Sequence, residues 1–250
     1  MATKGRPRSF DRDAALDAAL TEFWRHGYEA TSLSGLTRAM GINPPSLYAA
    51  FGDKRQLFTA AVQRYAATHG SYSARALARP TAREAVETML GLAAAGYAEP
   101  GHPPGCFVVD GATNTTDAAQ DVREELRALR EGVKQALAAR ITADAAAGLL
   151  PPVTRDEADG LAAFYASVIQ GMSTQARDGA DRATLERIAA LAMRAWPSAP
   201  VGTAIAESPE SPESPESPES PESPVSPVSA AGGCGDGGGR GAQGRTATAP

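Results

Sequence analysis

Residues 31–51 read TSLSGLTRAMGINPPSLYAAF and contain two short helical patterns. Thr31 and Ser32 can cap the start of the first pattern, and Gly41 can end it in a left-handed conformation. Apolar residues three or four positions apart mark the buried faces, with Leu33, Leu36 and Met40 in the first pattern and Leu47 and Phe51 in the second. The stretch predicts a helix over about 32–40, a turn, and a second helix over about 44–50.

The second short helix begins with an unusual run of residues. Asn43 can act as its N-cap, and Pro44 suits the first helical position because an N–H there would be unpaired anyway. Pro45 and Ser46 follow, and both are small. A helix that starts with small residues can approach the floor of a DNA major groove closely.

Longer helices are expected on both sides of this pair. A helix over about 10–26 is predicted by one apolar face, formed by Leu16, Ala19, Leu20 and Phe23. Gly27 follows as its cap. Asp53 with Gln56 three residues later is typical of a capping box, and it precedes a fourth helix with Phe58, Ala61, Val62 and Tyr65 on its apolar face.

Two short helices braced by longer ones form either a helix-turn-helix motif or an ordinary helical corner. The surrounding polar residues favour a DNA-binding motif, because hydroxyl and basic side chains suit phosphate oxygens. These residues are Thr31, Ser32, Thr37, Arg38, Tyr48, Lys54 and Arg55. A basic arm over residues 1–9 adds Lys4, Arg6 and Arg8.

The formal net charge of the 250 residues is −5, but the charge is unevenly distributed. Residues 201–250 contain seven acidic residues and two arginines. Residues 1–65 contain nine basic and six acidic residues, whereas residues 66–200 contain thirteen basic and sixteen acidic ones. We therefore expect a polyanion to dock on the N-terminal region.

Composition excludes several classes of protein. No apolar run approaches the ~20 residues that span a bilayer, and the charged N-terminus is unlike a secretory signal. The two cysteines are too few for a disulfide framework or a cysteine-based zinc site. Abundant alanine and only 6% aromatic residues favour helices over strands. We expect a soluble, intracellular, all-α protein that needs no metal or cofactor.

Residues 10–65 resemble the DNA-binding domain of the TetR/AcrR family of bacterial transcriptional regulators. The matching residues are Phe23, Gly27, Tyr28, Thr31, Ser32, Met40, Gly41, Ile42, Ser46, Leu47, Tyr48, Phe51, Lys54 and Leu57. The resemblance implies a three-helix helix-turn-helix domain at 10–69, with the motif at about 31–50, and a helical ligand-binding and dimerisation domain at 70–197. It also implies a cytoplasmic homodimer, bound to the nucleoid through a palindromic operator in double-stranded DNA, that acts as a repressor and answers to a small-molecule effector.

The resemblance also assigns roles to individual residues. Tyr48 and Lys54 are expected to hold phosphates with help from Thr31 and Ser32, whereas Pro45 and Ser46, with Ala49 as a further candidate, face the bases. Many relatives have a basic residue near Pro44 and an aromatic residue or histidine near Ala49. Because the residues here cannot donate hydrogen bonds, base readout is expected to rely on Ser46, thymine methyl groups and DNA shape.

Apolar stripes predict three helices in the second domain, over about 117–146, 155–177 and 181–196. Family members pack their last two helices into a four-helix dimer interface, which corresponds here to residues 155–196. The alternative is that these apolar faces serve only the core of the chain itself.

Residues 101–114 read GHPPGCFVVDGATN, which resembles a segment that forms a short helix beside the ligand cavity in one branch of the family. Cys106 is either a thiol that senses oxidants or electrophiles or a small packing residue. His102 and Cys106 would make a weak two-ligand metal site. The candidates for lining the effector pocket are Tyr97, Cys106, Phe107, Asn114, Phe164, Tyr165 and Met172.

Residues 198–250 contain Glu-Ser-Pro repeats with seven Ser-Pro steps between Ser208 and Ser226, followed by a glycine-rich stretch. This composition predicts a disordered tail with polyproline II character, which serves as a spacer or, alternatively, as a kinase substrate. No Ser–His–Asp grouping, HExxH motif or glycine-rich phosphate loop is present, so an enzyme is not expected. An adaptor that acts through the acidic tail is the remaining alternative.

Overall fold

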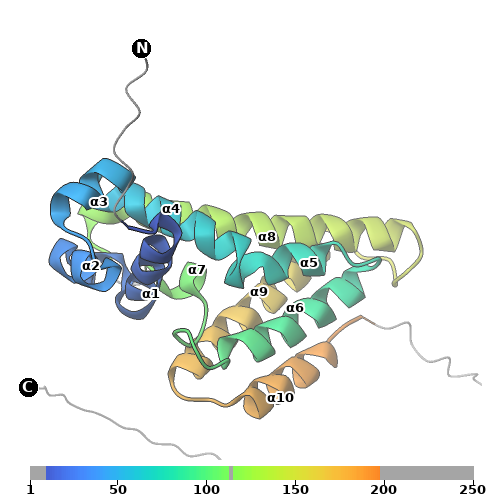
Figure 1. Ribbon diagram of the computed structural model, residues 1–250. Helices are drawn as coiled ribbons and strands as arrows, with labels where there is room; N and C mark the ends of the chain where they lie inside the picture. The colour runs from blue at the N-terminus through green and yellow to red at the C-terminus, as the bar shows by residue number, and fades with distance from the viewer. Residues whose placement is uncertain (1–9, 113–114, 198–250) are drawn as a thin grey trace, which may run out of the picture. The chain divides into compact units, whose positions relative to one another are not determined.

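The computed structural model describes residues 10–112 and 115–197, and every regular element in these residues is a helix (Figure 1). The predicted all-α fold is therefore confirmed. None of the described helices is long and apolar enough to cross a membrane. The basic arm, Asn114 and the Ser-Pro tail lie outside the described residues.

Four helices form what we call the head: α1 (Arg12–Ala30), α2 (Leu33–Met40), α3 (Pro44–Phe51) and α4 (Lys54–Ala67). Each helix begins after a side chain that accepts a hydrogen bond from its first turn, and these caps are Asp11, Ser32, Asn43 and Asp53. The capping box of Asp53 and Gln56 is present, and Gly41 closes α2 with a φ of 65°. Short-range signals thus set the helix limits here.

The first helix continues past its predicted end at residue 26. Gly27 has a φ of 76° and kinks the chain, after which α1 resumes and extends to Ala30. The kink brings the backbone N–H of Tyr28 to 2.9 Å from the carbonyl oxygen of Gly111. A glycine is needed here because of its positive φ, and a Cβ would also lie 3.4 Å from that same oxygen.

The remaining elements form what we call the body: η1 (His69–Ser71), α5 (Tyr72–Leu77), α6 (Ala82–Tyr97), α7 (Phe107–Asp110), η2 (Asp117–Ala119), α8 (Gln120–Ala146), α9 (Arg155–Arg177) and α10 (Arg182–Met193). The predicted helices over 117–146, 155–177 and 181–196 correspond to η2–α8, α9 and α10, although α10 ends three residues early. Helices α5 and α6 were not predicted. The buried residues of α6, half of them alanine, recur at helical spacing from Ala82 to Tyr97, so the signal for this helix was present in the sequence.

Helix α8 is the longest element, and Figure 1 shows it running beside α4 and α5. Helix α9 packs against α8, and α6 packs against α5, α9 and α10. The short helix α7 touches α1, α4, α8 and α9. It therefore lies where the head meets the body.

One apolar core extends through the head and the body. The ring of Phe107 is 5.4 Å from that of Phe58 and 5.6 Å from that of Tyr65, both on α4. Phe107 is completely buried, as are Tyr165 and Met172 on α9. All three residues belong to the core, and none of them is among the residues that line the cavity described below.

Candidate functional site

The outer face of α3 is the first candidate surface. Leu47 and Phe51 are buried, whereas Tyr48 is 51% exposed and Pro45 and Ala49 are also exposed. Ser46 is half-buried. The helix therefore presents the residues predicted to face DNA on the side opposite its packing face.

The start of α3 differs from an ordinary helix N-terminus. Pro44 and Pro45 have no backbone N–H, and the N–H of Ser46 donates to Asn43 Oδ1 at 2.9 Å. The first turn thus has no uncommitted amide for a phosphate, and contacts from this helix must come from its side chains. Tyr48 is the exposed residue of α3 with a hydrogen-bonding side chain.

Several predicted phosphate contacts have other partners. Thr31 is 3% exposed, and its hydroxyl donates to the carbonyl oxygen of Gly27 at 2.6 Å, so its side chain packs inside the head. Arg55 forms ion pairs with Asp121 and Glu125 of α8, which makes it a link between the head and the body. Leu33, assigned to the core by its spacing, is 38% exposed.

Two other predicted contacts remain at the surface of the head. Ser32 is exposed, and its Oγ accepts the N–H of Gly35 at 3.0 Å. The Lys54 ammonium lies 4.4 Å from the centre of the Tyr28 ring and donates to the carbonyl oxygen of Glu29 at 3.5 Å. Lys54 is half-buried, and this burial lowers its pKa. The hydrogen bond of Ser32 and the contacts of Lys54 therefore restrict where both side chains can point.

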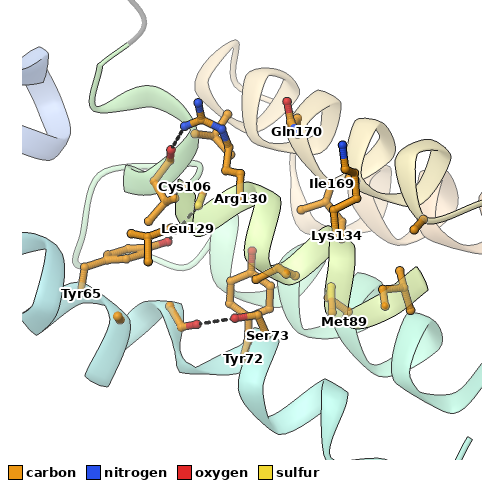
Figure 2. Close-up of a pocket in the computed structure, with 18 residues that line it drawn as sticks. Tyr65, Tyr72, Ser73, Met89, Cys106, Leu129, Arg130, Lys134, Ile169 and Gln170 are labelled. Carbon is orange, nitrogen blue, oxygen red and sulfur yellow. Dashed lines mark hydrogen bonds between the residues drawn. The ribbon is translucent and has the colours of Figure 1, made fainter. Parts of the chain in front are cut away.

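The second candidate site is a cavity of about 150 Å³ in the body (Figure 2). Its walls come from α4, η1, α5, α6, α8, α9 and the segment around α7. Most lining side chains are apolar, and they include Met89, Val108, Val109, Leu129, Val133, Leu137, Ala162, Ala166 and Ile169. The polar lining groups are Tyr65, Tyr72, Ser73, Cys106, Arg130, Lys134 and Gln170.

Cys106 lies at the cavity wall directly before α7 and is 4% exposed. Its backbone N–H donates to Ser173 Oγ at 2.7 Å, and that hydroxyl donates to Asp110 Oδ2 at 2.7 Å. Gly105 has a φ of 82°, and a Cβ there would lie 2.9 Å from the carbonyl oxygen of Ser173. The Gly-Cys pair is therefore what allows this segment to pack tightly against α9.

Buried tyrosines surround the Cys106 thiol. The Tyr65 hydroxyl donates to Cys106 Sγ at 3.3 Å, and the Tyr72 and Tyr97 hydroxyls are 2.7 Å apart. Burial raises the pKa of all three phenols. They consequently remain protonated at neutral pH, and Tyr65 and Tyr72 act as hydrogen-bond donors at the cavity wall.

Arg130 and Lys134 of α8 supply positive charge to the cavity wall. The half-buried Arg130 guanidinium donates to the carbonyl oxygen of Val108, as Figure 2 shows. Its pKa is lowered mainly because burial disfavours the charged form. Lys134 Nζ pairs with Glu131 at 2.7 Å.

Of the predicted effector-pocket residues, Cys106 lines this cavity. Tyr97 instead lines a neighbouring polar hollow, and Phe164 is 42% exposed beside a surface groove of α9. Sequence reasoning missed Arg130 and Lys134, which alternate with Leu129, Val133 and Leu137. The sequence signal for these two residues was their position beside the apolar stripe of α8, but that stripe was interpreted as a side of the helix that faces the core.

The polar hollow contains two histidines. The His102 ring stacks on Trp24 at 4.8 Å and lies 4.7 Å from the ring of His69, and burial with the nearby His102 lowers the pKa of His69. His102 Nδ1 is 2.8 Å from the carbonyl oxygen of Pro103. In the described residues no group of three or more side chains could hold a metal ion. The described residues therefore supply no third ligand for the suggested metal site at His102 and Cys106.

Two family models together match most of the described chain. Residues 15–61 match "Bacterial regulatory proteins, tetR family", and residues 82–192 match "Tetracyclin repressor-like, C-terminal domain". The chain belongs to the TetR family. The resemblance stated from the residues of the head is thereby confirmed, and the TetR-family assignment extends to the body.

Named relatives of this TetR-family chain are transcriptional repressors. It is 35% identical over 197 residues to the HTH-type transcriptional repressor ComR of Escherichia coli. The matched residues make up 78% of this chain and 93% of ComR. It is 35% identical over 178 residues to the repressor BdcR of the same organism, covering 70% and 83% of the two chains. A solved structure of a cysteine mutant of the TetR-family regulator CifR, complexed with 26-bp double-strand operator DNA, has a TM-score of 0.72 and 42% identity, covering 77% of this chain and all of that one.

Proposed function

We propose that this chain is a transcriptional repressor that binds a palindromic operator as a homodimer in the bacterial cytoplasm and is released by a small-molecule effector. The exposed face of α3, with Pro45, Tyr48 and Ala49, supports the DNA-binding role. The relatives support it as well, since ComR and BdcR are repressors and CifR was solved with operator DNA.

The observation that best supports control by an effector is that α4 belongs to both sites. Tyr65 of α4 packs its ring 5.0 Å from that of Trp24 in α1, and the same tyrosine lines the cavity. A ligand that binds differently to two positions of α4 therefore changes the population of the DNA-binding position. Such coupling is typically about 1–3 kcal/mol, or roughly 5–150-fold in affinity.

Exposed apolar side chains on the last two helices support the homodimer. Phe164 on α9 is 42% exposed, and Leu191 on α10 is 61% exposed. Pairing these helices with those of a second copy would cover both side chains and hold two α3 helices in place for two half-sites, about one DNA turn or more apart.

The test is binding of the full chain to the DNA directly upstream of its own gene, measured by fluorescence anisotropy over a series of salt concentrations. We expect a complex with two chains per duplex, protection of a palindrome, and log affinity that falls steeply with log salt. Leu191→Asp should yield a monomer with much weaker binding. Weak binding that is the same on all sequences, here and in a genome-wide selection, would contradict the proposal.

A second candidate function is a thiol-based repressor that senses oxidants or electrophiles through Cys106. Its support is that Cys106 Sγ lies at the cavity wall within 3.3 Å of the Tyr65 hydroxyl. With an electrophile, an S–C bond would form and the thiol proton would pass to the electrophile. Cys106→Ser separates the two versions, because effector release that survives this substitution would contradict the thiol mechanism.

A further inference from the structure

The charge of the cavity wall is opposite to that of the surrounding body. Residues 66–200 contain three more acidic than basic residues, yet the lining includes Arg130 and Lys134 and, among the described residues, no carboxylate. The other polar lining groups include the phenols of Tyr65 and Tyr72, which burial keeps protonated. The polar part of the wall thus offers positive charge and hydrogen-bond donors, which suits an anion.

Arg130 is the cavity cation without an ion pair among the described residues, although the charge of the nearby Asp110 favours its protonated form. Lys134 pairs with Glu131 at 2.7 Å, whereas no carboxylate of the described residues forms an ion pair with Arg130. The nearby Asp110 accepts from Ser173 and pairs with Arg177 at 3.7 Å. A half-buried guanidinium that donates to one backbone carbonyl retains N–H groups that a ligand carboxylate could bind in a bidentate fashion.

The size of the cavity limits the rest of the ligand. Its volume is about 150 Å³, and a cavity of about this size accommodates a benzene-sized apolar group. Leu129, Val133 and Ile169 line this space, and Figure 2 shows Arg130 and Cys106 towards one end and Met89 and Ile169 towards the other. The apolar body and the anionic group of one ligand would therefore have separate places.

We propose that the cavity binds a small monocarboxylate whose apolar body is about the size of a benzene ring, with its carboxylate on Arg130. This inference rests on the ligand-responsive function proposed above, because it names the chemical class of the effector. A neutral molecule of the same shape would fill the apolar space but leave the Arg130 charge uncompensated. A cationic molecule of that shape would be repelled.

Isothermal titration of the full chain at neutral pH tests the ligand class without DNA. The probes are benzoate, phenylacetate and hexanoate, and benzyl alcohol is the neutral counterpart of benzoate. We expect at least one carboxylate to bind, with benzoate at least tenfold tighter than benzyl alcohol. Absence of binding by all three carboxylates, or equal affinity for benzoate and benzyl alcohol, would overturn the proposal.

Variants of α8 then test the role of Arg130. Arg130→Gln should lower the affinity for the bound carboxylate at least tenfold and leave that for benzyl alcohol unchanged. Arg127→Gln is the matched control, since Arg127 is an exposed arginine of the same helix outside the cavity wall. Arg130→Lys retains the charge and should restore part of the preference, and it replaces Arg130→Gln if that variant unfolds. A carboxylate preference that is the same in wild type, Arg130→Gln and Arg130→Lys would overturn the assignment.

Operator binding in the presence of the same carboxylates separates the two proposals. Carboxylate binding without any change in DNA affinity would support the ligand class and contradict its role as an effector. If another compound releases the chain from its operator and none of the three carboxylates binds, the repressor function is supported and the proposed ligand class is overturned.

Discussion

The head and the cavity wall are both built from helices, but the half-buried Arg130 of the cavity wall has a partner much farther along the chain than the helix caps of the head do. In the head, Asp11, Ser32, Asn43 and Asp53 each accept a backbone hydrogen bond at the start of a helix. The cavity-wall helices α6 and α9 are also capped, by Thr81 and Thr154, whereas α8 begins without a side-chain cap hydrogen bond. Its half-buried Arg130 depends on the carbonyl oxygen of Val108, 22 residues away.

This difference separates a surface determined by local sequence from a site determined by long-range packing. In the head, caps from near neighbours in the chain set where α2, α3 and α4 begin, and Tyr48 lies on the exposed face of α3. The cavity exists because the Gly105–Phe107 segment, α8 and α9 meet, and their residues are far apart in sequence. Substitutions in the two regions should therefore differ in size and kind.

The largest effect is expected at the junction of the two regions. Phe107→Ala removes a fully buried ring that contacts Phe58 and Tyr65, and should lower the free energy of unfolding by about 4 kcal/mol. Leu149→Ala is the control, because Leu149 is 60% exposed, and should cost less than about 1 kcal/mol. Guanidinium denaturation at one protein concentration measures both. Equal losses would mean that Phe107 does not join the head to the body.

Two glycines with positive φ provide a sharper comparison. Gly105→Ala places a Cβ 2.9 Å from the Ser173 carbonyl oxygen at a φ of 82°, and should cost about 3 kcal/mol from strain and collision. Gly41→Ala at the end of α2 meets open space at a φ of 65°, and should cost about 1 kcal/mol. Thermal unfolding of both variants tests this order, and a larger loss for Gly41→Ala would reverse it.

On DNA, Tyr48→Phe should weaken binding by about 1 kcal/mol, or about fivefold, because one phosphate hydrogen bond is lost. The loss should be the same for operator and random duplexes, since a phosphate contact does not read sequence. The exposed position of Tyr48 predicts an unchanged melting temperature. Equal affinity of wild type and variant would remove Tyr48 from the DNA contacts.

The smallest effect is expected for the link between α4 and α8. Hydrogen bonding to Arg55 lowers the pKa of Asp121, so this pair stabilises the fold above about pH 4 and loses that contribution as the pH falls through the folded value. Arg55→Gln should cost less than about 1 kcal/mol at pH 7, because Asp121 is 58% exposed and solvent screens the pair. The difference from wild type should shrink below pH 4 in urea denaturation. A constant difference down to pH 2 would mean that the ion pairs are not its source.

Helices α2 and α3 could be predicted from sequence almost to the residue, because capping side chains and glycines act within four positions, whereas α1 runs four residues past its predicted end. In the body, α5 and α6 were missed, although the buried residues of α6 recur at helical spacing from Ala82 to Tyr97. The Gly-Cys segment leads into the short helix α7, and Cys106 lines the cavity. Of the aromatic residues proposed for the pocket, Phe107 and Tyr165 pack in the core, where bulky apolar side chains fill the space between helices.

The sequence by itself determined where α2 and α3 begin and end, which face of α3 is apolar, and that the N-terminal region is the basic part of the chain. Tertiary structure decided that Thr31 is buried, that Arg55 pairs with α8, and that Leu129 and Val133 face a cavity rather than a neighbouring helix. It also decided that Arg130 is half-buried without a carboxylate partner among the described residues. Caps and turns depend on adjacent residues, whereas burial and charge compensation depend on what the rest of the chain brings alongside.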